Sequence, residues 1–403
     1  MRSSWKIRAS AVALLAAGLA GNAALAQSWL DSLEPRVLRL ADFAGNENAN
    51  FGRAMVAWEQ EITEFTGGRI TFENYWSSSL LNAMSTLSGI SDGVADIGLI
   101  IPTYYPQDLP VASWLFGMGA ALSGSTVHDV AAGGATAQET LLTLPAVIEE
   151  YASRNMVVLH GTSTPAYNLL CNKPINSLAE AQGIRARAIG SVWSSTAEAL
   201  GMTPVSIAFN EAYEGLQRGV FDCMVINPNQ YVDGLTLRDV APEYVPVTFA
   251  QLQASTWVMN LDTWNSFPVE LQNFIIEANA RAAQAIWQGY LRIEARAGEL
   301  IASGGVRTND VSELEPVAAA QRAAYVAAMA ANAPAAVGDG QAVIDAYLAR
   351  IAYWTGVLEE QGIPVAERTP EAIVEAFRGL GDIDLGPFIA RFNAEVLPGL
   401  MVQ

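Results

Sequence analysis

The first hundred residues alternate between two hydrophobic periodicities. Apolar side chains at 51, 55, 58, 62 and 65 recur in steps of three and four, which predicts a helix, and Gly67 and Gly68 supply its stop. Residues 36–42, 70–76 and 95–101 are predicted as strands, whereas 81–90 returns to helical spacing. This order of elements is typical of a parallel sheet covered by helices.

A second α/β series begins at residues 156–160. Strands are predicted at 168–172, 185–189 and 220–225, and a helix near 194–200. Asn210 is expected to cap a further helix that Gly219 ends.

The chain then changes character and becomes helical. A pattern that starts after Pro268 and ends at Gly304 and Gly305 predicts one helix longer than usual, long enough to span two lobes. The alanine-rich remainder contains another amphipathic helix around 344–358.

Composition narrows the class of protein. The 403 residues are 51% hydrophobic, but beyond the N-terminus no uninterrupted apolar stretch reaches spanning length, which excludes a multi-span membrane protein. The net charge is −19 and the bases are scattered, which argues against a nucleic-acid partner.

The N-terminus has the pattern of an export signal. Arg2, Lys6 and Arg8 precede an apolar stretch at 11–20, and a small-x-small signal predicts cleavage after Ala26. We therefore expect residues 1–26 to be removed and the product to be free in the periplasm. In that oxidising compartment Cys171 and Cys223 could form a disulfide, although two buried thiols are equally compatible with the sequence.

Candidate catalytic motifs lack the context that they need. Residues 89–93 match G-x-S-x-G around Ser91, but the motif ends a predicted helix instead of joining a strand to a helix. The two histidines, His128 and His160, are interpreted as structural. A serine hydrolase using Ser91 is the enzymatic alternative.

Cofactor and metal motifs are also absent from the sequence. No cluster has metal-ligand spacing and no nucleotide-binding glycine motif occurs, while Asp382 and Asp384 fit an ordinary polar turn. We expect no cofactor.

Several linked motifs carry a family resemblance. They are NKPINSLA (172–179), GIRAR (183–187), ALGMTPV (199–205) and EAYEGLQRGVFD (211–222). This order resembles the periplasmic substrate-binding proteins of TRAP transporters, the C4-dicarboxylate-binding type. The likeness extends over about 36–305, and the remaining C-terminal residues exceed the family's usual ending.

The resemblance implies an α/β fold of two lobes, with crossing strands and a long hinge-spanning helix. We expect lobe 1 to comprise 27–164 with about 254–293, and lobe 2 to comprise 165–253 with about 294–403, including an extended helical C-terminus. The implied function is a non-enzymatic receptor that captures a small organic acid and delivers it to a small and a large membrane subunit. A monomer is expected; a sensory module of the same fold is a further alternative.

The same resemblance assigns Arg187 as the clamp of the ligand carboxylate. Its planar, permanently charged guanidinium suits a two-point hydrogen bond to a carboxylate. Some members carry a second arginine where this chain has Tyr167. That departure favours a monocarboxylate, or a ligand with a hydroxyl facing Tyr167.

The resemblance suggests Asn227 and Phe209 as further ligand contacts, and position in the chain suggests Trp193, Tyr104 and Tyr105. Asn227 follows a predicted strand one place later than the asparagine of the sialic-acid-binding branch. Trp193 and Phe209 could form apolar walls. Tyr104 and Tyr105 follow the third strand, where ligands of α/β proteins collect.

Overall fold

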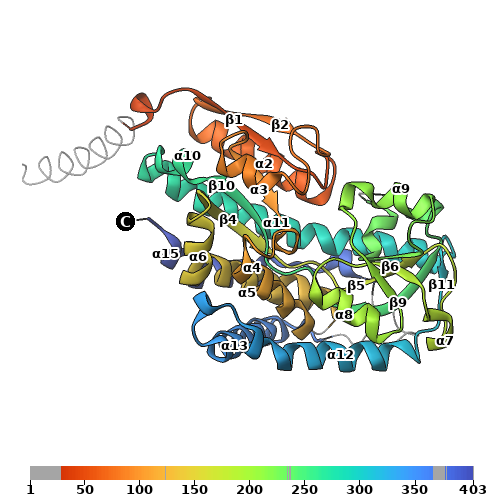
Figure 1. Ribbon diagram of the computed structural model, residues 1–403. Helices are drawn as coiled ribbons and strands as arrows, with labels where there is room; N and C mark the ends of the chain where they lie inside the picture. Colours follow the sequence, from red (N-terminus) through yellow and green to blue (C-terminus); the bar gives the residue numbers. More distant parts are fainter. Residues whose placement is uncertain are drawn as a thin grey trace, which may run out of the picture.

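The computed structural model describes residues 29–122, 124–233, 235, 237–365, 377 and 379–402. The predicted leader, 1–26, lies outside the described residues. The described chain forms two separate sheets with helices packed around them, and Figure 1 shows the long helix α11 (Val269–Ala302) passing behind both.

The first sheet has five strands in the order β2-β1-β3-β10-β4. β1 pairs in parallel with β2 and β3, whereas β10 is antiparallel to both of its neighbours. The strands are β1 (Arg36–Ala41), β2 (Ile70–Tyr75), β3 (Ile97–Ile100), β4 (Met156–Thr162) and β10 (Ser255–Asn260). The helices of this half are α2 (Asn50–Phe65), α3 (Thr86–Ser91), α4 (Pro110–Phe116), α5 (Thr126–Thr143), α6 (Pro145–Ala152) and α10 (Leu261–Asn265).

The second sheet has six strands in the order β11-β9-β5-β8-β6-β7. The strands are β5 (Tyr167–Cys171), β6 (Arg185–Arg187), β7 (Thr203–Val205), β8 (Cys223–Ile226), β9 (Glu243–Phe249) and β11 (Arg307–Thr308). Its short helices are α7 (Leu178–Ala181), α8 (Ser191–Ala199) and α9 (Ala212–Gln217).

The chain crosses between the sheets twice in antiparallel directions, at 163–166 from β4 to β5 and at 250–254 from β9 to β10. The crossings are hydrogen-bonded to each other: Gln253 Nε2 donates to Ser163 Oγ (2.6 Å), and the Leu252 N–H donates to Thr164 Oγ1 (3.1 Å). We divide the molecule at these crossings into a first lobe around β2-β1-β3-β10-β4 and a second lobe around the other sheet.

The long helix predicted after Pro268 is present as α11, with 34 residues and Pro268 as its N-cap residue. At 1.5 Å per residue it is about 50 Å long, which exceeds the diameter of one lobe. It packs on α2, α5 and β4 of the first lobe and continues past the turn Pro228–Tyr231 of the second.

The C-terminal helices extend along both lobes. They are α12 (Leu314–Met329), α13 (Gly340–Glu360) and α15 (Gly386–Leu400). α12 packs on α8 and β9 of the second lobe and on the turn Gly117–Ala121 of the first. α13 packs on α5, so the C-terminus that we had grouped with the second lobe also covers the first. In Figure 1 α12 and α13 run in sequence along one side of the molecule.

Two local predictions were wrong in detail. The helix expected at 81–90 begins only at Thr86, because Asn82 Oδ1 accepts the N–H groups of Met84 and Ser85 and forms a turn there. Asn210 caps no helix: it lies inside the 3-10 turn Phe209–Glu211, and α9 begins after that turn without a side-chain cap.

The sequence left the pairing of Cys171 and Cys223 open, and in the structure their sulfurs are bonded. The two residues face each other on the antiparallel strands β5 and β8, and both are fully buried. The bond closes a loop of sequence separation 52, which holds α7, α8 and α9 to the sheet.

We expect the double variant Cys171→Ala/Cys223→Ala to have a free energy of unfolding lower by about 4 kcal/mol, because the unfolded chain regains the entropy of that loop. Urea unfolding of both proteins without reductant measures the difference. A loss below about 1 kcal/mol would contradict the role of this cross-link in stability.

Candidate functional site

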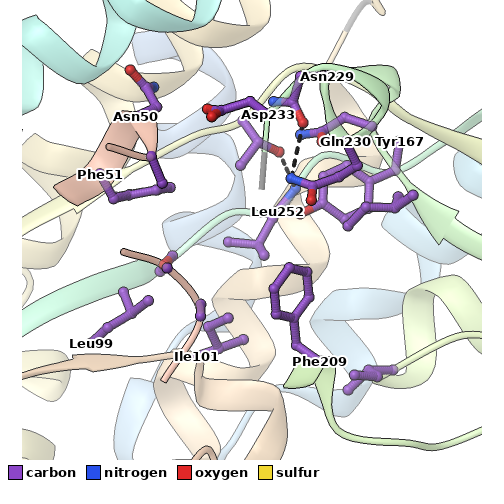
Figure 2. Close-up of a pocket in the computed structure, with 18 of the residues that line it drawn as sticks. Asn50, Phe51, Leu99, Ile101, Tyr167, Phe209, Asn229, Gln230, Asp233 and Leu252 are labelled. Atoms are coloured by element: carbon purple, nitrogen blue, oxygen red, sulfur yellow. Dashed lines mark hydrogen bonds between the residues drawn. The ribbon is translucent and has the colours of Figure 1, made fainter. Parts of the chain in front are cut away.

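A cavity of about 120 Å³ lies where the two lobes meet. Figure 2 shows Asn50, Phe51, Leu99 and Ile101 of the first lobe on one side and Tyr167 and Phe209 of the second on the other. Six of the predicted ligand residues line it: Tyr104, Tyr167, Arg187, Trp193, Phe209 and Asn227. The space suits a small molecule, and both lobes contribute to its walls.

Arg187 ends β6 and is 2% exposed. Its Nε donates to the carbonyl oxygen of Ile207 (2.9 Å) and its Nη2 to the hydroxyl of Tyr104 (3.3 Å). In the part of the chain that the structure describes, no carboxylate pairs with it. Burial lowers the pKa of the guanidinium. An arginine has five N–H donors and the two bonds above use only part of them, so Arg187 can still donate to another acceptor.

Tyr104 connects the lobes at this point. It ends the 3-10 turn Pro102–Tyr104 at the carboxyl end of β3, and its hydroxyl accepts from Arg187 and from the N–H of Phe209 (3.2 Å). Because both bonds use its oxygen as acceptor, the hydroxyl proton of Tyr104 remains available to a ligand.

A second contact between the lobes lies beside the first. Gly190, at φ +77°, precedes α8, and a Cβ there would come within 2.9 Å of the side chain of Thr103. Only glycine fits both this backbone conformation and the close approach.

The apolar wall is an aromatic stack. The rings of Tyr167 and Trp193 are stacked with centroids 4.6 Å apart, and Phe116 contacts Trp193 edge-on at 5.3 Å. Trp193 Nε1 donates to the carbonyl oxygen of Ala250 (2.7 Å), which fixes its ring to the second crossing. Burial raises the pKa of Tyr167, so its hydroxyl stays protonated.

Of the predicted ligand contacts Asn227 and Tyr105, only Asn227 lines the cavity. Asn227 follows β8, lines the cavity and is 3% exposed, and none of the described residues forms a hydrogen bond with its Oδ1. Tyr105 does not line the cavity: its hydroxyl donates to the carbonyl oxygen of Ala83 and accepts from the N–H of Leu87. The Tyr105 ring is part of the core of the first lobe, because the 3-10 turn directs consecutive side chains in different directions.

Sequence reasoning missed several polar lining residues. Asp42 and Asn50 come from the first lobe, whereas Asn229, Gln230 and Asp233 follow β8. Figure 2 shows the last three close together, and Gln230 Nε2 donates to Asn229 Oδ1 (3.1 Å). Asp42 could have been found, because it directly follows β1 and the carboxyl ends of parallel strands collect ligand contacts.

Asp42 is buried and carries no charged partner. Its Oδ1 accepts the N–H groups of Ala44 (2.7 Å) and Gly45 (3.2 Å), and within the described part of the chain Oδ2 has no partner. Burial raises the pKa of Asp42 from 3.8 to about 6, and the two backbone bonds oppose that shift.

The catalytic alternative finds no support at Ser91. Ser91 lines a different pocket, together with Arg36, Arg39, Asp96 and Asn155 among others, and no histidine lines it. His160 is fully buried without hydrogen-bond partners, and burial lowers its pKa to about 3. His128 lies near Ser125 instead (3.3 Å).

The described residues contain neither a metal-binding cluster nor a membrane-spanning helix. Within the described ranges, no three His, Cys, Asp or Glu side chains are grouped so as to hold a metal ion. No helix in the described part of the chain has the length and apolarity needed to cross a membrane.

We expect Asp42→Asn to stabilise the ligand-free protein at about pH 8, by about 3 kcal/mol. The folded-state pKa of Asp42 lies above 3.8, so the fold favours the neutral acid, and the stability that this acid contributes is lost as the pH rises through about 6. The advantage of the variant should therefore vanish at about pH 3, below the unfolded pKa of 3.8. Urea unfolding at both pH values measures it, and equal stability at pH 8 would show that the charge is compensated.

Comparison with known proteins places the chain in a family. Residues 40–332 match the bacterial extracellular solute-binding proteins, family 7 (DctP). A solute-binding protein of Roseobacter denitrificans is 27% identical over 292 residues, which cover 70% of this chain and 82% of the relative.

Solved structures share the fold. An extracytoplasmic solute receptor of Bordetella pertussis that binds pyroglutamic acid has a TM-score of 0.67 at 21% identity, covering 78% of this chain and 99% of its own. A TRAP periplasmic solute-binding protein of Bordetella bronchiseptica with bound mandelate has a TM-score of 0.67 at 20% identity, with 79% and 99% covered. Because the family match spans well over half of the chain, this protein belongs to family 7 of the bacterial extracellular solute-binding proteins, whose members bind solutes and are not enzymes.

Proposed function

We propose that this protein captures a small organic monocarboxylate in the periplasm and delivers it to the membrane subunits of a TRAP-type transporter. The observation that carries the proposal is the unpaired guanidinium of Arg187 on the wall of the cavity between the lobes. A buried cation without a counterion is costly, and a carboxylate in the cavity would remove that cost.

The rest of the cavity favours one carboxylate over two. Arg187 is the only Lys or Arg among the described residues that line it, whereas Asp42 and Asp233 are acids. A second ligand carboxylate would approach these acids without a cation to hold it, and like charges at close range repel. The aromatic stack of Tyr167 and Trp193 offers the ligand body an apolar surface.

The ligands named for similar structures are consistent with this class. Those proteins bind pyroglutamic acid and mandelate, which are small, compact monocarboxylates. The export pattern of residues 1–26, with cleavage after Ala26, supports a periplasmic location, where such a receptor meets its solute before the membrane subunits do.

Capture would use the contacts between the lobes. The bonds of Tyr104 to Arg187 and to the Phe209 N–H join the two walls directly over the anchor. Closing the lobes removes water from the guanidinium and thereby strengthens its attraction to a carboxylate.

We expect Arg187→Met to raise the dissociation constant for the bound acid by a factor of at least ~100, because the bound carboxylate loses its counterion. A thermal-shift screen of organic acids, including pyroglutamate and mandelate, identifies the acid; at 100 times the dissociation constant it should stabilise the protein by about 2.7 kcal/mol. Methionine replaces the buried guanidinium with an apolar side chain, so the ligand-free variant should not be less stable than wild type.

The control is Arg185→Gln. Arg185 lies two positions earlier on β6, but its side chain is 45% exposed and pairs with Asp222 (3.2 Å), outside the cavity. This variant should bind as wild type does. The proposal fails if no acid shifts the melting temperature, or if the shift is unchanged in Arg187→Met.

We expect Tyr104→Phe to weaken binding about 10-fold, because the variant loses the hydroxyl that holds Arg187 and Phe209 and can donate to the ligand. The melting temperature of the ligand-free protein should change little, since the side chain of Tyr104 is only half-buried. Isothermal titration with the acid from the screen measures the change, and an unchanged affinity would remove Tyr104 from the site.

A further inference from the structure

A second unpaired charge lies in the same cavity as Arg187. Asp42 is 1% exposed, and only one of its two carboxylate oxygens is used by the protein. Oδ1 accepts the Ala44 and Gly45 N–H groups, whereas Oδ2 is buried and has no hydrogen-bond partner among the residues that the structure describes. An ionised carboxylate can only accept hydrogen bonds, so the unused atom requires a donor.

The two buried charges do not satisfy each other. Across the described residues neither Asp42 nor Arg187 forms an ion pair, and no hydrogen bond joins them. The cavity therefore presents an unpaired cation and an unpaired anion at separate points on its wall. A ligand with one carboxylate and nothing else would satisfy the first and leave the second without a partner.

We propose that the ligand of this cavity carries an N–H or O–H donor in addition to its carboxylate, and that Asp42 Oδ2 accepts that donor. The inference rests on the proposed carboxylate function, because Arg187 holds the other end of the ligand. An acid without the donor would exclude water from Oδ2 without forming a hydrogen bond to it. A buried polar group left unpaired in this way weakens the binding of such an analogue.

A second acceptor on the opposite lobe supports the inference. Asn227 Oδ1 is buried, lines the cavity, and has no partner among the described residues. Thr103 Oγ1 is also unpartnered, but a hydroxyl can donate or accept and so does not discriminate. The acceptors without donors thus come from both walls, as expected if a donor-bearing ligand completes them.

Isothermal titration with matched pairs of acids tests the proposal. The pairs are pyroglutamate against 5-oxotetrahydrofuran-2-carboxylate, proline against cyclopentanecarboxylate, and mandelate against phenylacetate. Within each pair the carboxylate is kept and one donor is removed, as an amide N–H, an ammonium and a hydroxyl respectively. We expect the donor-bearing member of at least one pair to bind ~10- to 100-fold more tightly, and the pair concerned identifies the donor.

The variant Asp42→Asn tests whether Asp42 causes the tighter binding of the donor-bearing acid. The asparagine can keep its Oδ1 on the backbone N–H groups and then places an NH₂ group where Oδ2 was, so a donor on the ligand meets a donor on the protein. The preference within the pair should disappear in this variant. Glu59→Gln is the matched control, because Glu59 is also a buried carboxylate with one unpartnered oxygen among the described residues but does not line the cavity, so this variant should leave the preference intact.

Three results would overturn the proposal. Equal binding of both members of every pair, with both lost in Arg187→Met, would leave the carboxylate function standing without the donor. A preference that survives in Asp42→Asn would move the donor contact to another residue, and a preference that is lost in Glu59→Gln as well would show that its loss is not specific to Asp42. Absence of binding by every acid tested would overturn the carboxylate function and this inference with it.

Discussion

The two hydrogen-bonded crossings at 163–166 and 250–254 constrain everything else in this molecule. Because β4 leads straight into β5 and β9 leads straight back into β10, the two sheets are held end to end and their strand ends face a common space. The packing here leaves no tolerance: a Cβ at Gly119 would come within 2.1 Å of the carbonyl oxygen of Gln251. The position of the cavity follows from this joint.

The two buried charges in the cavity are the groups that our proposals assign to a ligand. Other arginines of this acidic chain lie at the surface beside a carboxylate, as Arg185 does with Asp222. Arg187 and Asp42 instead are almost completely buried and form no ion pair with any described residue, and burial shifts the pKa of each so that its neutral form is favoured. Such an arrangement costs folding free energy, which is a common property of sites prepared for a charged ligand.

The C-terminal segment beyond the family match packs against helix α11. Four aromatic rings of α11, α13 and α15 pack together with centroids 5.5 to 6.2 Å apart: Trp287, Trp354, Phe388 and Phe392. Asn273 on α11 forms two hydrogen bonds with the backbone of Val402 (2.7 and 3.1 Å). No residue after Tyr290 lines the cavity in the described chain. The described C-terminal helices therefore pack against the elements around the cavity and contribute no side chain to its wall.

Local patterns in the sequence predicted the long helix α11 and the family of the protein. The apolar spacing after Pro268 predicted α11 because a long amphipathic helix needs only local information. The linked motifs around 172–222 indicated the family, which the family match confirms, and the same resemblance is the source of our proposal that Arg187 binds the ligand carboxylate.

The tertiary structure alone decided which polar groups are left without partners. Tyr104 and Tyr105 are neighbours in the chain, yet one reaches Arg187 across the lobes and the other bonds to Ala83 in the core. Asp42 gave no signal beyond its place after a strand, because the lack of a donor for its Oδ2 depends on side chains brought together from both lobes. Burial and the absence of a counterion are properties of the assembled cavity, and no local pattern of residues encodes them.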